Sequence, residues 1–162
     1  MEKQKLIMNQ VIVHRQATTL DVIITTPIRQ EEIDKVIKQL ESEGHVCRKI
    51  PANKLPTDLT YERAWFFNDD LIVPIDINPN SAKEILRNRW RETRAPLLQS
   101  LDAKYMMALE RNDSAAMASI SVQKQKLRNI TTEQIIPDRL PSETIDAYSK
   151  RLNACCPKIL TI

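Results

Sequence analysis

The chain has 162 residues, the length of about one ordinary domain, and 42% of them are hydrophobic and 28% charged. These values are typical of a globular protein and exclude a wholly disordered chain. Glycine occurs once, at Gly44. A P-loop, a dinucleotide-binding glycine motif and a G-x-S-x-G elbow each need at least two glycines, so the composition excludes all three.

Charge is distributed unevenly along the chain, although the net charge is only +3. Residues 1–79 carry ten Lys/Arg and twelve Asp/Glu, net −2, whereas residues 80–162 carry fourteen and nine, net +5. The second part could therefore meet an acidic partner, but it is far from a strongly basic nucleic-acid-binding domain. No apolar run approaches the roughly 20 residues that cross a bilayer, so we expect no membrane span, no signal peptide and synthesis in the cytoplasm.

The first part of the chain predicts a small antiparallel sheet with one helix. Aliphatic runs at 11–13 and 20–24 indicate two adjacent strands. Between residues 30 and 43 apolar side chains recur at i, i+3, i+4 and i+7, which predicts an amphipathic helix capped by Gly44. Further strands are expected at 45–50, 64–67 and 71–75.

The second part predicts helices. A capping-box pattern at Ser81 and Glu84 opens a helical period that runs toward Arg111. Pro96 is expected to kink or split this helix, because proline lacks the backbone N–H group. A turn then leads into a second helix at 114–129, which completes an antiparallel helical hairpin.

Three segments result from these predictions, and the fold class is α+β. A sheet-plus-helix module covers residues 1–79 and a helical hairpin covers 80–130. Thr131 and Thr132 are expected to cap another short turn, within a short helix and irregular tail at 131–162.

Residues that commonly carry catalysis or bind metal are few. His14 and His45 lie far apart in the sequence, and His45 with Cys47 forms a single i, i+2 pair on one side of a strand. Paired carboxylates such as Asp69 and Asp70 are adjacent in the chain rather than converging from two elements. We predict no catalytic residues, no metal and no cofactor. An enzyme would need a pocket that joins distant residues such as His45 and Asp69.

Candidate partner-binding residues lie in the first long helix and in an aromatic run. Arg87, Arg91 and Arg94 share one helix face, which predicts contact with phosphates or with an acidic protein surface; a solvated face with local ion pairs is the alternative. Trp90 lies on the apolar stripe of the same helix. Phe66 faces away from its two aromatic neighbours, and aromatic residues are enriched at subunit interfaces. We predict all five as partner-binding residues.

Nine short segments between Ile50 and Thr131 carry a family resemblance. They are IPA at 50–52, LPTD at 55–58, RAW at 63–65, AKEI at 82–85, RAPLL at 94–98, LD at 101–102, YM at 105–106, ALE at 108–110 and QKQKLR at 123–128. Together they resemble a family of small, mostly uncharacterised phage and prophage proteins encoded beside tail, tail-fibre and fibre-assembly genes. The longer start and the end after Ile130 depart from the family's pattern.

The resemblance implies a non-enzymatic protein of the virion tail, synthesised in the host cytoplasm. It would be a structural adaptor in the tail or fibre attachment region, or alternatively a tail-fibre assembly chaperone absent from the mature particle. Its partners would be other phage tail or fibre proteins, in an oligomer or a heteromeric assembly. A nucleic-acid-binding module is the competing hypothesis, although aromatic residues that could stack on bases make up only 4% of the chain.

Overall fold

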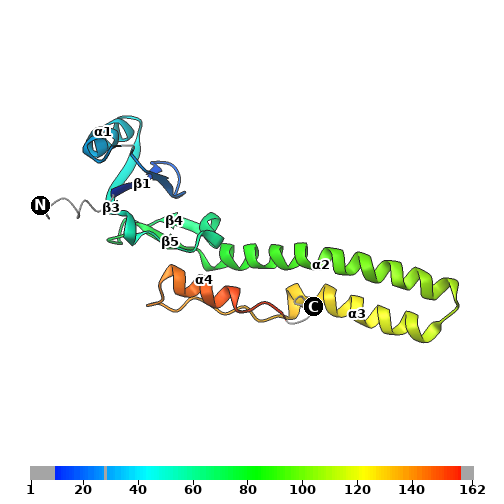
Figure 1. The fold of residues 1–162 in the computed structure, drawn as a ribbon. Helices are drawn as coiled ribbons and strands as arrows, with labels where there is room; N and C mark the ends of the chain where they lie inside the picture. Colours follow the sequence, from blue (N-terminus) through cyan, green and yellow to red (C-terminus); the bar gives the residue numbers. More distant parts are fainter. Residues whose placement is uncertain (1–9, 28, 158–162) are drawn as a thin grey trace, which may run out of the picture. The chain divides into compact units, whose positions relative to one another are not determined.

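The structure is a computed structural model and describes residues 10–27 and 29–157. It combines helices with strands, which confirms the α+β class (Figure 1). The chain divides into two units, Met1–Asn78 and Pro79–Ile162, and each is described by itself. All strands of the described residues lie in the first unit, and the described residues after 130 belong to the second unit.

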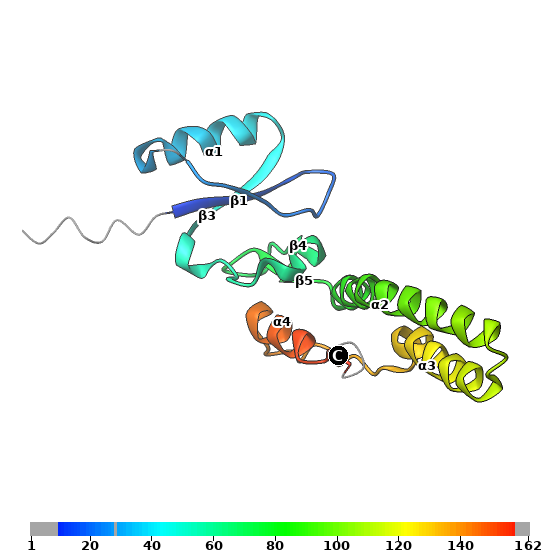
Figure 2. The ribbon, with the colours of Figure 1, turned by 45° about the vertical axis from the view of Figure 1, so that its right-hand side comes forward.

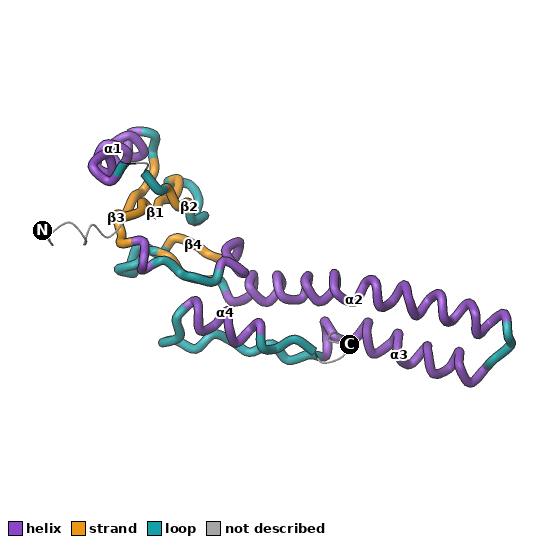
Figure 3. The backbone as a smooth tube through the Cα atoms, viewed as in Figure 1, coloured by secondary structure: helices purple, strands orange, loops and turns teal. Residues whose placement is uncertain are grey.

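A three-stranded antiparallel sheet opens the first unit. Its strands are β1 (Gln10–Gln16), β2 (Ile23–Thr25) and β3 (His45–Pro51), in the order β2-β1-β3 (Figure 3). Ile12 and Val13 of the central strand are both fully buried. Because successive side chains of a strand point to opposite faces, the sheet is covered on both faces at this place.

One amphipathic helix packs on this sheet. The helix α1 (Ile33–Ser42) contacts β3 and β1, and Figure 2 shows it lying along them. A 3-10 turn at Gln30–Glu32 precedes it in place of the first predicted helical turn. Gly44 follows with a φ of +84°, the left-handed conformation expected of a glycine cap, so this prediction is confirmed.

A second, two-stranded sheet follows in the first unit. It consists of β4 (Trp65–Phe67) and β5 (Ile75–Ile77), paired antiparallel. The strand predicted at 71–75 is wrong in position, because β5 begins only at Ile75. Pro74 has no N–H group for a ladder, and the preceding residues form a loop closed by the Asn68 N–H, which donates to the Pro74 carbonyl at 3.2 Å.

The second unit begins with one helix of 32 residues, α2 (Pro79–Glu110). The helix begins before Ser81. Of the two outcomes expected at Pro96, a kink or a split, the split does not occur, because the proline lies inside α2. Pro96 and Glu92 are both exposed. The Glu92 carbonyl, which loses its usual partner at Pro96, can therefore bind water while the helix continues.

The helix α3 (Ser114–Glu133) packs beside α2 after a short turn (Figures 1 and 2). Asn112 turns the chain with a φ of +52°, and the Asp113 carboxylate caps α3 by accepting a hydrogen bond from the Ala116 N–H at 2.9 Å. The helix extends past the predicted end at 129. Thr131 and Thr132 are therefore inside α3 and do not cap a separate turn.

The last described helix is α4 (Ile145–Asn153), which contacts α2. The Thr144 hydroxyl caps it by accepting a hydrogen bond from the Ala147 N–H at 3.2 Å. Tyr148 and Leu152 of α4 are fully buried and form the core of this end of the unit. Within residues 10–27 and 29–157, no helix combines the length and the apolar character that crossing a membrane requires.

Candidate protein-docking surface

The core between α2 and α3 is narrow. Beyond residue 97 its buried side chains are Leu101, Ala108, Leu127, Ile130 and Thr131. Two helices without a third layer cannot cover all the apolar side chains that they carry. Four large ones in this stretch are 46–55% exposed: Met106, Met107, Leu109 and Val122.

Charged and aromatic side chains close one side of the α2–α3 pair. The Lys124 ammonium of α3 lies 2.5 Å from a carboxylate oxygen of Asp102 on α2 and 5.3 Å from the centre of the Tyr105 ring. The side chain of Lys124 is only 17% exposed. This contact links the helices by an ion pair and a cation–π interaction.

The opposite side of the pair is open. A groove of about 370 Å³ runs between the helices and is lined mostly by apolar surface. Its lining comes from both helices: Leu97, Ser100, Leu101 and Lys104 of α2, and Gln123, Lys126 and Leu127 of α3. Lys126 and Lys124 are two residues apart, about 200° around a helix, so they lie on different sides of the pair. We call this open side the α2–α3 groove.

Two lysines give the α2–α3 groove its charge. Among the residues that the structure describes, Lys104 and Lys126 have no carboxylate partner, in contrast to Lys124. The groove therefore offers an apolar floor with two cations at its edge. A segment with apolar and acidic side chains fits this chemistry.

Two of the three arginines predicted to bind a partner are held by a neighbouring glutamate. Arg91 donates to Glu84 at 2.6 Å and also to Asn88, and Arg87 donates to Glu84 at 3.4 Å. The hydrogen bond from Arg91, with the charges of both arginines, lowers the pKa of Glu84 below its usual value. This arrangement matches the solvated face with local ion pairs that the sequence left open.

Arg94 connects the two helices. Its Nη1 donates to the carbonyl oxygens of Arg128 at 2.7 Å and Leu127 at 3.2 Å, both on α3. The row of arginines thus divides, because Arg94 serves the α2–α3 contact while Arg87 and Arg91 face Glu84.

Trp90, which the sequence placed on the apolar stripe of its helix as a partner-binding residue, lies in the core. Its side chain is 2% exposed, and its indole Nε1 is buried without a hydrogen-bond partner. Phe66 is half-buried in β4 and paired with Asp76.

Sequence reasoning missed Lys104 and Lys126. The sequence shows that Lys104 and Lys126 lie near Leu97 and Leu127 on their helices. Which side of the helix pair stays open, however, depends on how α3 packs on α2.

The first unit brings the two histidines together. Their Nδ1 atoms lie 3.0 Å apart, and the His14 Nε2 lies 2.8 Å from the Thr25 hydroxyl. Burial and, to a smaller degree, the charge of His45 lower the pKa of His14. Burial raises the pKa of the Cys47 thiol, which stays free. In the described part of the chain, no three His, Cys, Asp or Glu side chains gather as metal ligands.

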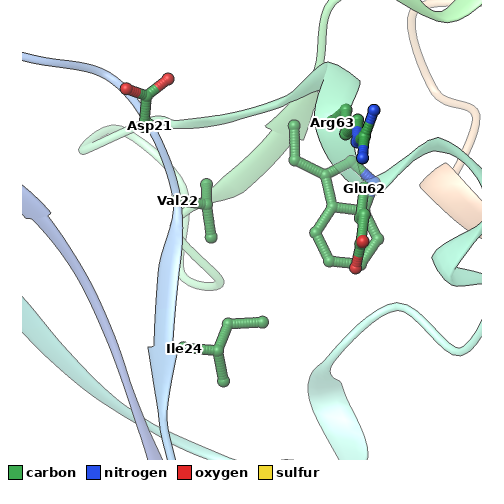
Figure 4. Close-up of a pocket in the computed structure, with 6 residues that line it drawn as sticks. Asp21, Val22, Ile24, Glu62 and Arg63 are labelled. Atoms are coloured by element: carbon green, nitrogen blue, oxygen red, sulfur yellow. The ribbon is translucent and has the colours of Figure 1, made fainter. Parts of the chain in front are cut away.

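A pocket of about 360 Å³ also lies in the first unit. Asp21, Val22 and Ile24 face Glu62 and Arg63 across it (Figure 4), and Trp65 completes the lining. The pair named for a hypothetical enzyme is not part of this pocket. His45 contacts His14, while Asp69 forms an ion pair with Arg15 at 3.2 Å.

Comparisons of the chain with protein-family models, with curated proteins and with solved structures find no match.

Proposed function

We propose that this chain is a non-enzymatic docking protein whose second unit binds another polypeptide at the α2–α3 groove. One observation carries this proposal: the groove is open and apolar, and its two lysines lack partners among the described residues. Met107, which is exposed and lies three residues after Lys104 on the same side of α2, extends the apolar surface. Contiguous exposed apolar surface rimmed by charge is typical of protein interaction sites.

The biological setting of this proposal is the phage tail, and it rests on the sequence resemblance. In this setting the chain is a structural adaptor in the virion tail or the fibre attachment region, with a helical hairpin of α2 and α3 as its docking element. The partners are other tail or fibre proteins, or further copies of the chain. An adaptor is retained after assembly and therefore remains in the finished particle.

Mass spectrometry of purified particles and of the producing cells tests the adaptor. We expect peptides of this chain in both samples, at a fixed ratio to a tail protein in the particle. Peptides in the cells but none in the particles would overturn the adaptor and favour the assembly chaperone.

The engagement of the arginines supports a protein partner over nucleic acid. Phosphate binding by this row would need its guanidinium groups free to face a nucleic-acid backbone. Arg87 and Arg91 donate to Glu84, and Arg94 donates to α3 carbonyls. Filter binding tests this point: we expect no retention of single- or double-stranded DNA at low salt, and retention that falls steeply with salt would favour the nucleic-acid module.

A further inference from the structure

The loop between β4 and β5 carries the most exposed large apolar side chain among the described residues. Ile72 is 95% exposed, and Leu71 beside it is 38% exposed. The loop is closed at its base, because the Asn68 N–H donates to the Pro74 carbonyl and the Leu71 N–H donates to the Asn68 carbonyl at 3.3 Å. We call residues 69–72 the Ile72 loop.

The two aspartates of the Ile72 loop have different roles. Asp69 anchors it: its carboxylate pairs with Arg15 at 3.2 Å and its backbone carbonyl accepts from Arg48 at 3.2 Å. The Asp70 backbone N–H donates to the Asn68 side chain at 3.1 Å, but the Asp70 carboxylate has no partner among the described residues. A free carboxylate thus stands two residues from an exposed isoleucine.

The Ile72 loop and the α2–α3 groove are complementary in chemistry. The loop presents apolar side chains with one free carboxylate, and the groove presents an apolar floor with the free ammonium groups of Lys104 and Lys126. Burial of Ile72 in the groove would remove apolar surface from water on both partners. Face-to-face pairing of two grooves is less favourable, because it would bring lysines against lysines.

Chain length prevents the Ile72 loop from filling the groove of its own copy, whatever the orientation of the two units. The seven steps from Ile72 to Pro79 span about 25 Å even when fully extended. The helix from Pro79 is about 27 Å long to Leu97, at the near end of the groove, and about 33 Å long to Leu101, at its middle. The Ile72 loop can therefore touch at most the near end of its own groove, and it can fill only the groove of another copy.

We propose that the Ile72 loop of one copy inserts into the α2–α3 groove of a second copy. Such a contact joins different surfaces of the two copies, so that it continues from copy to copy into a ring or a filament. The inference rests on the proposed docking function and names the chain itself as a partner of the groove. Its contact area is that of a short loop, so each contact is weak and reversible.

Complementation between two variants of the full chain tests this proposal. Ile72→Asp removes the apolar tip of the loop and leaves the groove intact. Leu97→Asp places a charge among the apolar side chains of the groove and leaves the loop intact. Sedimentation is measured at low salt from roughly 10 µM to 1 mM, the range of affinities expected for a small interface. Circular dichroism of each variant verifies that the helices remain.

The wild-type chain is expected to form species larger than dimers as its concentration rises, and each variant alone is expected to remain monomeric. An equimolar mixture of the two variants should form a 1:1 dimer that grows no further, because it retains one intact loop and one intact groove. A monomeric wild type over the whole range, or a mixture that stays monomeric, overturns the proposal. Association of each variant with itself also overturns it.

Charge-reversal variants provide a second, independent test of the proposal. Lys104→Glu with Lys126→Glu should weaken association about 10-fold or more, and added Asp70→Lys should restore it. The matched control, Arg111→Glu with Lys150→Glu, makes the same charge change at exposed sites outside the groove. Equal weakening by the control pair, or no restoration by Asp70→Lys, overturns the proposal. A monomeric chain that is nevertheless present in the particles would refute self-docking alone and leave the adaptor standing.

Discussion

The guanidinium of Arg94 on α2 donates a hydrogen bond of 2.7 Å to the backbone carbonyl of Arg128 on α3. The same nitrogen donates to the Leu127 carbonyl at 3.2 Å. Both carbonyl oxygens belong to α3, so one side chain of α2 is hydrogen-bonded to two residues of the neighbouring helix. A charged side chain that sequence analysis assigned to a partner is thus used to hold the two helices together.

Replacement of Arg94 by methionine should lower the free energy of unfolding of the second unit by about 1–2 kcal/mol, because it removes hydrogen bonds from a charged donor but keeps the apolar stem. Urea unfolding followed by helical circular dichroism measures this change. Arg91→Met is the matched control and should cost at most about 0.5 kcal/mol, because exposed ion pairs contribute little. Equal losses in the two variants would contradict the structural role of Arg94.

Truncation of Trp90 to alanine should cost about 3–5 kcal/mol, as expected for a large aromatic side chain in a core. Trp90→Phe should cost far less, because it also removes an indole N–H group that is buried without a partner. Trp65→Ala, in the first unit, should cost about as much as Trp90→Ala, since Trp65 is 8% exposed. A loss below about 1 kcal/mol for Trp90→Ala would contradict the core position of this ring.

Acidification should destabilise the first unit through His14. Its pKa in the folded chain is lowered from the usual 6.5 by burial and by His45. The unfolded chain therefore takes up the proton first, so this contribution to stability is complete above pH 6.5 and is lost as the pH falls through the lowered pKa.

The slope of unfolding free energy against pH measures this effect, and His14→Gln should flatten it just below pH 6.5. Glu143→Gln is the control from the second unit. The hydrogen bond from Arg151 lowers the pKa of Glu143 from its usual 4.5, so its contribution is lost only below that value. A slope below pH 6.5 that is unchanged in His14→Gln would contradict the assignment.

Gly44→Ala should destabilise the first unit by about 1 kcal/mol, because the Cβ of alanine is strained in the left-handed conformation that glycine adopts freely. No atom lies within 4 Å of the added Cβ, so the loss would come from the backbone alone. Gly44→Asn should cost less, since asparagine tolerates this conformation better. Thermal unfolding compares the three proteins, and a more stable alanine variant would contradict this account.

Local patterns in the sequence predicted the helices and strands whose determinants are local. The apolar period at 30–43 and the glycine after it predicted α1 with its cap, and the aliphatic run at 11–13 predicted β1. The run at 20–24 predicted β2 only in part, because this strand begins at Ile23. Pro96 does not split α2, because a proline on an exposed face can be tolerated in a helix that packs along its other face. The start of β5 was misplaced because Leu71 and Ile72, apolar enough for a strand, are exposed in a loop.

Relations between elements were not accessible from local patterns. His14 and His45 meet because β1 pairs with β3 in the register that places His14 opposite Cys47, so His45 is a diagonal neighbour on the same face. In the same way, the periodicity of α2 could not show which side α3 would leave open. The arginine row is therefore visible in the sequence, whereas the α2–α3 groove depends on the packing of α3 on α2.

Site-specific photocrosslinking from the α2–α3 groove tests the docking surface most directly. A benzophenone-bearing amino acid replaces Ser100, which lines the groove, or Ala95, an exposed control position about 140° around α2 from Ser100. After irradiation in cells that assemble the particle, we expect a covalent adduct with a polypeptide, identified by mass spectrometry, from position 100 but not from position 95. No adduct from position 100, or equal adducts from both positions, would contradict it.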